Sequence, residues 1–120
     1  MNFEIQKKDN YTIIQILSDK IDYKIAPLLK SEVILLLGEG EKNIILDLSK
    51  CTYCDSEGLN AILISKRLCK NSNGTLVVGG VKDKVEQLIS LSQLDKVLNI
   101  AYNINKAEDM MISLIEENKL

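Results

Sequence analysis

Two cysteines, Cys51 and Cys54, have the residue type and spacing that most directly suggest chemistry. Paired thiols separated by two residues near the start of a helix can cycle between a dithiol and a disulfide. Here Asp55 and Ser56 predict that the helix begins only after the second cysteine, which weakens that interpretation. Reduced thiols are the simpler expectation, and a small thiol redox protein stays an alternative.

The rest of the composition removes most other catalytic chemistry. The chain has no His and only one further cysteine, Cys69. Without His there is no Ser-His-Asp triad, and too few ligands remain for a structural zinc site, which usually takes four. The acidic residues form no recognisable general acid–base pair. We therefore expect a protein that is not an enzyme, with no catalytic residue, no metal and no cofactor.

Charge and hydropathy limit the partners. Fifteen basic and seventeen acidic residues leave a net charge of −2, and the basic residues are scattered as singles and pairs such as Lys66-Arg67. Nucleic-acid binding requires clustered cations. No stretch approaches the ~20 apolar residues that span a bilayer, and Met1–Glu4 lacks the basic start of a signal peptide. We expect one intracellular domain, residues 1–120, with no nucleic acid and no membrane insertion.

The elements that must position any site alternate between strands and helices after an initial hairpin. Helices are predicted from Pro27 to about Leu37, with Leu28, Leu29, Val33, Leu36 and Leu37 on the inward face, from Asp55-Ser56 to about Lys70, over Lys82–Leu91 and over Lys106–Asn118. Strands are predicted in the hairpin Phe3–Leu17, over Asn43–Leu48, over Thr75–Val78 and over Ile100–Ile104. This order predicts an α/β domain with a mixed β-sheet of about five strands, an N-terminal hairpin followed by βα units, and about four helices.

The segment between Asp47 and Leu59 joins a central strand to the start of a helix. In open α/β sheets, binding sites tend to lie at this position. Asp55 or Ser56 is suited to cap the helix, and Glu57 in its first turn complements the helix dipole. A well-capped helix with no binding role would also account for these residues.

The same segment resembles the signature of the STAS family, the sulfate-transporter and anti-sigma-antagonist domains. Asp47-Leu48-Ser49 and Asp55-Ser56-Glu57-Gly58-Leu59 fall at the family's spacing, and Leu17–Asp22 is similar to the stretch after its second strand. The resemblance covers nearly the whole chain. It implies a STAS-like fold and an anti-sigma factor antagonist in the bacterial cytoplasm. The implied partner is an anti-sigma factor that is also a serine kinase of the histidine-kinase-like ATPase type.

The chain departs from this family at two positions. Asp19 stands where the family usually has Gly, and Glu57 stands where it places the phosphorylated Ser or Thr. A carboxylate cannot accept phosphate as a stable serine ester, and it carries less charge than a phosphoserine. Three hypotheses follow: Glu57 mimics the phosphorylated state, or a basic residue of the partner compensates and binding is constitutive, or Ser56 has become the acceptor.

The resemblance also implies a contact surface. Its expected members come from the loops and the first helical turns: Asp22, Tyr23, Asp55, Ser56, Glu57, Gly58, Asn60 and Ala61. Gly58 would either let a partner backbone approach or permit a tight contact inside the fold. Asp22 is expected near the phosphorylation site or as a residue that caps or precedes the first helix, and both can hold together. The alternative function is a STAS subunit that docks on a membrane transporter or on a stressosome-like scaffold.

Overall fold

A computed structural model describes residues 2–119 of the chain. A five-stranded sheet contains β1 (Phe3–Lys7), β2 (Thr12–Ile16), β4 (Ile44–Asp47), β6 (Leu76–Gly79) and β7 (Asn99–Ile100). The helices are α1 (Ala26–Gly38), α2 (Ser56–Asn71), α3 (Asp83–Leu91) and α4 (Ile104–Asn118), with a short 3₁₀ turn at Leu94–Lys96. Two further short strands, β3 (Lys20–Ile21) and β5 (Tyr53–Cys54), form a separate small sheet.

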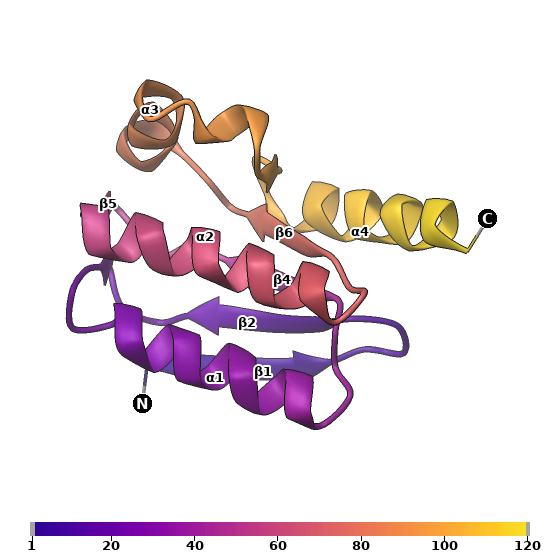
Figure 1. The fold of residues 1–120 in the computed structure, drawn as a ribbon. Coiled ribbons are helices and arrows are strands. Elements are labelled where there is room, and N and C mark those ends of the chain that lie inside the picture. The colour runs from indigo at the N-terminus through magenta and orange to yellow at the C-terminus, as the bar shows by residue number, and fades with distance from the viewer. Residues whose placement is uncertain (1, 120) are drawn as a thin grey trace.

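The main sheet has the order β1-β2-β4-β6-β7 and is mixed. β1 and β2 form the predicted antiparallel hairpin, while β2–β4, β4–β6 and β6–β7 are parallel pairs. Helices α1 and α2 lie side by side on one face, and α4 covers the other (Figure 1). The predicted fold class, a mixed α/β domain with four helices and a five-stranded main sheet, is confirmed.

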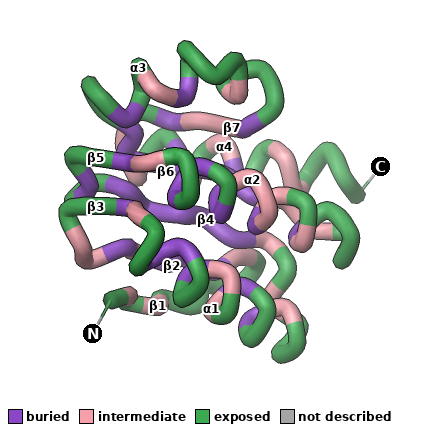
Figure 2. Tube along the Cα trace, turned by 60° about the vertical axis from the view of Figure 1, so that its left-hand side comes forward, coloured by how far each residue is buried: buried purple, intermediate pink, exposed green. Residues whose placement is uncertain are grey.

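β4 shows why the centre of the sheet is buried on both sides. Ile44 and Leu46 point into the larger apolar cluster beneath α1, α2 and α3. Ile45, one residue out of phase, points into the smaller cluster beneath α4. Because side chains alternate along a strand, the continuous run Ile44-Ile45-Leu46 fits only a strand with layers on both faces. The buried trace of this strand runs through the middle of the molecule (Figure 2).

Three expectations about the elements are corrected. The stretch around Lys20-Ile21, which lies outside every strand and helix predicted from the sequence, pairs in parallel with β5 as a second sheet. The strand expected over Ile100–Ile104 is Asn99–Ile100, because the side chain of Asn103 accepts a hydrogen bond from the Lys106 amide at 2.8 Å and starts α4 at Ile104. Leu28, expected on the inward face of the first helix, is 45% exposed.

Within residues 2–119, no helix has both the length and the hydropathy that crossing a membrane requires.

Candidate functional site: the N-terminal end of α2

The exit from β4 is closed by a short hydrogen-bonded turn. The carboxylate of Asp47 accepts hydrogen bonds from the Ser49 amide at 3.0 Å and from the Ser49 hydroxyl at 2.5 Å, and Leu48 between them is buried. The backbone of Gly80, with φ of +70°, lies so close to Ser49 that an added Cβ would be 2.5 Å from its Oγ. The Asp47-Leu48-Ser49 motif therefore fixes the direction in which the chain leaves the sheet.

The small β3–β5 sheet carries the chain from that turn to the start of α2. Lys20 pairs with Tyr53 and Ile21 with Cys54, and the Thr52 amide donates to the Asp19 carbonyl at 2.8 Å. The two strands lie next to each other at the edge of the molecule (Figure 2). This pairing connects the loop before α1 to the loop before α2, so residues more than thirty positions apart meet at one surface.

The cysteines beside this small sheet are part of the core. Cys51 and Cys54 are each 6% exposed, and their thiols donate to the carbonyls of Ser18 and Asp55. Burial is the main cause that raises the pKa of each thiol to about 12. The next largest cause is the neighbouring Cys54 for Cys51 and the Asp55 carboxylate for Cys54. A reactive cysteine needs the opposite, a lowered pKa that supplies thiolate at neutral pH. The arrangement opposes the redox interpretation of the Cys51–Cys54 pair.

Asp55 is the N-cap of α2, as one of the two predicted possibilities had it. Its Oδ1 accepts a hydrogen bond from the Gly58 amide at 2.8 Å, which satisfies one of the amides left open at the helix start. Its Oδ2 accepts from the Tyr23 amide at 3.1 Å. One carboxylate thus caps α2 and holds the loop that precedes α1 against it.

Gly58 has a structural role inside the fold. A Cβ at this position would lie 2.0 Å from the carbonyl oxygen of Ile21, so any side chain would collide with backbone of β3. Gly58 is buried. Of its two expected explanations, the structure supports the tight internal contact and not an opening for a partner backbone.

The remaining predicted contact residues divide by exposure. Tyr23 is 63% exposed, and Ser56, Glu57 and Asn60 are also exposed. Ala61 is fully buried against the sheet, so its side chain is not available to a partner, which corrects its place among the contact residues.

Asp22 is half-buried and acts locally. Its Oδ1 accepts from the amides of Lys24 at 3.0 Å and Ile25 at 3.3 Å, which orders the turn before α1. Asp22 thus precedes the helix as part of a turn, while the N-cap residue of α1, Ile25, has no side-chain cap. We call the set Asp22, Tyr23, Asp55, Ser56, Glu57 and Asn60 the α2 N-terminal surface.

Glu57 carries the charge of this surface. It lies in the first turn of α2, where the helix dipole stabilises a carboxylate by about 0.3–1 kcal/mol. Among residues 2–119 it makes no hydrogen bond or ion pair with another side chain, unlike Asp55 beside it. Its carboxylate is therefore fully available to a binding partner.

Sequence reasoning missed one exposed aromatic residue close to this surface. Tyr53 on β5 is 49% exposed and lies beside a cavity of about 400 Å³ that Lys82 and Lys84 also line. A two-residue strand has no periodicity, so no sequence pattern indicated which side chain of this segment would point outward.

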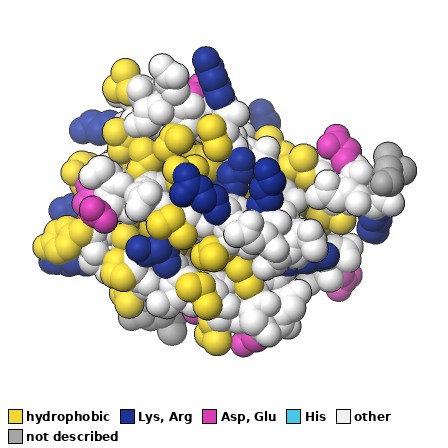
Figure 3. Space-filling view, viewed as in Figure 1, with side chains coloured by type: hydrophobic (Ala, Val, Ile, Leu, Met, Phe, Trp, Pro, Cys, Tyr) yellow, Lys and Arg dark blue, Asp and Glu magenta, His cyan; other side chains and the backbone are white. Residues whose placement is uncertain are grey.

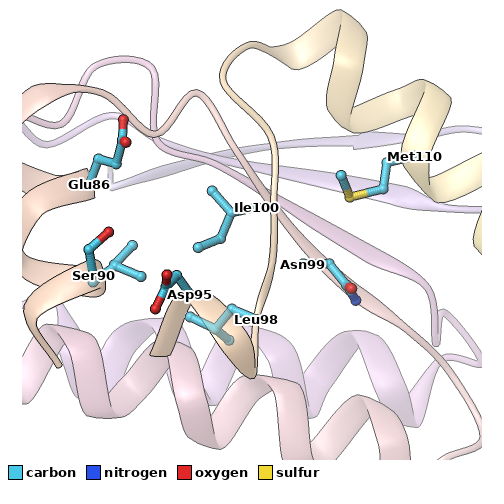
Figure 4. A pocket seen from close by; sticks show the side chains of 8 residues that line it. Glu86, Ser90, Asp95, Leu98, Asn99, Ile100 and Met110 are labelled. Atoms are coloured by element: carbon cyan, nitrogen blue, oxygen red, sulfur yellow. The ribbon is translucent and has the colours of Figure 1, made fainter. Parts of the chain in front are cut away.

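A second cavity of about 400 Å³ lies away from this surface, between α3, β7 and α4. Its lining is mixed: apolar residues such as Ile100 and Met110 alternate with polar ones, including the carboxylates of Glu86 and Asp95 (Figure 4). No residue of the α2 N-terminal surface lines it. Over the part of the chain that the structure describes, no group of three or more Cys, Asp or Glu residues has the geometry of a metal site.

The fold is a mixed α/β domain built around a capped helix that follows a central strand. The STAS domain profile matches residues 2–107, and the chain belongs to the STAS domain family. The anti-sigma-B factor antagonist of Bacillus subtilis is 24% identical over 102 residues, which cover 84% of this chain and 93% of that protein. Anti-sigma factor antagonists are thus among its relatives, and they are regulatory binding proteins.

Solved structures agree with this assignment. A crystal structure of a candidate anti-sigma factor antagonist from Thermotoga maritima is 26% identical, with a TM-score of 0.79, and the match covers 91% of this chain and 93% of that one. A sulfate transporter family protein from Wolinella succinogenes is 21% identical with a TM-score of 0.77, over 87% of this chain and 86% of that one. At that identity the second match shows the shared fold alone.

Proposed function

We propose that this chain acts as an anti-sigma factor antagonist whose binding is constitutive, with Glu57 as a permanent charge read by a basic residue of the partner. The partner we propose is an anti-sigma factor that is also a serine kinase of the histidine-kinase-like ATPase type, in the bacterial cytoplasm. The protein acts by contact and not by catalysis. The observation that carries the proposal is the exposed carboxylate of Glu57 in the first turn of α2, which pairs with no other side chain among residues 2–119.

The neighbouring residues support a contact role for this surface. Tyr23 presents an exposed aromatic ring, a residue type enriched in interface cores, and Asn60 lies one helical turn beyond Glu57. Asp55 holds both α2 and the Tyr23 backbone in place, so the surface is ordered before a partner arrives. Little conformational freedom would be lost on binding.

Calorimetric titration into the anti-sigma kinase of the same genome tests the proposal. We expect the native chain to bind, and Glu57→Gln to bind about tenfold to a hundredfold more weakly, because a hydrogen bond to a charged group contributes roughly 1.5–3 kcal/mol. The matched control is Glu86→Gln, which neutralises an exposed first-turn glutamate of α3 and leaves the affinity unchanged. If Glu57→Ser binds and the native chain does not, Glu57 is a silent mimic of the phosphorylated state.

Ser56 is the other candidate for control of this surface. It is the first residue of α2 and is exposed, as is Glu57, but neighbouring helical residues point about 100° apart. A kinase aimed at position 57 would not reach the Ser56 hydroxyl in the same pose. Incubation with the kinase and ATP should leave the peptide that contains Ser56 unmodified by mass spectrometry, and phosphate on Ser56 would restore switching to this protein.

A further inference from the structure

Helix α1 has aliphatic residues on two opposite sides, although the fold covers only one of them. Ala26, Leu29, Val33 and Leu36 are buried against the sheet and α2. The opposite side carries an uncharged row with helical spacing, which we call the α1 stripe: Pro27, Leu28, Ser31, Ile34, Leu35 and Gly38. Its three aliphatic side chains are 45%, 57% and 58% exposed.

A helix that is hydrophobic all round is normally buried all round. Hydrophobic side chains lie along the α1 part of the surface, whereas Lys and Arg side chains gather near α2 (Figure 3). Ile112 on α4 is a useful comparison, because it is an exposed isoleucine with charged neighbours. It is 50% exposed, but Asp109 and Glu116 lie one helical turn away on either side. The α1 stripe has no such interruption, and this marks it as an interaction surface.

The charges beside the stripe indicate what covers it. Lys30 and Glu32 flank Ser31, about 100° to either side of the centre of the stripe. Both are half-buried, and within residues 2–119 neither forms an ion pair. When two copies of one helix pair in parallel about a two-fold axis, opposite flanks meet, so Lys30 of each copy lies beside Glu32 of the other. An antiparallel pair would instead bring like charges together.

The stripe is also shaped for close approach. Its centre is the small Ser31, and Gly38 has no atom within 4 Å of the position a Cβ would take. We propose that the α1 stripe is a homodimer interface, in which α1 pairs in parallel with α1 of a second copy of this chain. Leu28, Ile34 and Leu35 then lose their exposure to water on both copies, and the two Lys30–Glu32 pairs set the orientation.

The parallel arrangement has a consequence for binding. Helices α1 and α2 start at the same end of the molecule (Figure 1). A parallel dimer through α1 therefore presents its two α2 N-terminal surfaces at one end. If the proposed function holds, such a dimer engages a two-site partner bivalently and gains avidity without any new contact. The pairing itself does not rest on that function.

Sedimentation equilibrium over a wide range of protein concentrations tests the interface directly. We expect the native chain to dimerise and Ile34→Asp to stay monomeric, because the substitution places two carboxylates within the apolar contact. Ile112→Asp is the matched control and dimerises as the native chain does. Circular dichroism shows whether each variant is folded. A native chain that is monomeric throughout, or a dimer that survives Ile34→Asp, overturns the proposal.

Charge exchange tests the orientation. Lys30→Glu or Glu32→Lys alone should raise the dimer dissociation constant on the order of tenfold, since each replaces two weak attractions with two repulsions. The double exchange, Lys30→Glu with Glu32→Lys, should restore native affinity. Single variants that dimerise like the native chain would overturn the parallel pairing. Because no partner protein is present in these experiments, their failure is separate from any failure of the proposed function.

Discussion

Helices α1 and α2 lie side by side on the same sheet face, yet they are held there in different ways. α2 begins at a side-chain cap, Asp55, and is locked to β3 where Gly58 meets Ile21. α1 has no side-chain cap at its N-cap residue, Ile25, and is held by its buried aliphatic residues. Specific polar contacts make the α2 end a defined surface. Polar contacts order only the turn before α1, burial holds the helix itself, and within residues 2–119 its outer side has no partner.

The largest expected effect on stability comes from a glycine in α2, and the matching glycine in α1 should show almost none. Gly58→Ala should lower the free energy of unfolding by about 4 kcal/mol, because the new Cβ collides with the Ile21 backbone and one of two elements must move. Gly38→Ala, at the end of α1, meets open space and should be neutral or slightly stabilising. Urea denaturation of both variants measures the difference. Equal stabilities would contradict the close packing of Gly58 against Ile21.

Burial in α1 should have the next largest effect. Leu29→Ala should cost about 3 kcal/mol, because it removes a fully buried side chain and leaves a cavity. Leu35→Ala on the exposed side should cost under about 0.5 kcal/mol when the protein is dilute enough to stay monomeric. Thermal unfolding at low concentration checks both values. A large loss for Leu35→Ala under those conditions would contradict the exposed position of the stripe.

The cap of α2 should have a smaller effect. Asp55→Ala removes the acceptor of the Gly58 and Tyr23 amides and should lower the free energy of unfolding by about 1–2 kcal/mol. Asp55→Asn keeps an acceptor for the Gly58 amide and should recover most of that loss. Chemical denaturation compares the two variants. If Asp55→Asn is no better than Asp55→Ala, the charge matters more than the cap.

The smallest effect is a dependence on alkaline pH that distinguishes α2 from α1, since all three thiols lie in or beside β5 and α2; Tyr11 beneath α4, with its pKa also raised to about 12 by burial, adds to it. Burial raises the pKa of Cys51, Cys54 and Cys69 to about 12, from 9.0. The folded state therefore favours the protonated thiols, so their contribution is complete below about pH 9 and is lost as the pH rises toward 12. Denaturation midpoints at rising pH measure that loss.

Thiol labelling gives a second readout of the same burial. At pH 8, Ellman's reagent should label the folded protein far more slowly than the urea-unfolded protein, because the thiolate is the reactive species. Rapid labelling of the folded chain would revive the redox alternative for Cys51 and Cys54.

Local signals in the sequence were strong where a residue acts on its own neighbours. The polar residues before α2 predicted the cap at Asp55, and the run Ile44-Ile45-Leu46 predicted a strand buried on both faces. The local signals were weak where one residue fits two different structural roles. Asn103 caps α4 but stands within an alternating apolar stretch, which made the strand after Leu98 look longer than it is.

The sequence alone determined the order of the main-sheet strands and the four helices, the STAS resemblance and the unusual Glu57, because hydrophobic periodicity, capping residues and motif spacing are local properties of the chain. Only the tertiary structure decided that β3 pairs with β5, that Gly58 fits against Ile21 and that Ala61 is out of reach. The tertiary structure also decided that Leu28 is exposed to solvent. These outcomes depend on which distant segments meet, and a helix with aliphatic residues on two opposite sides carries no signal of which side the sheet will cover.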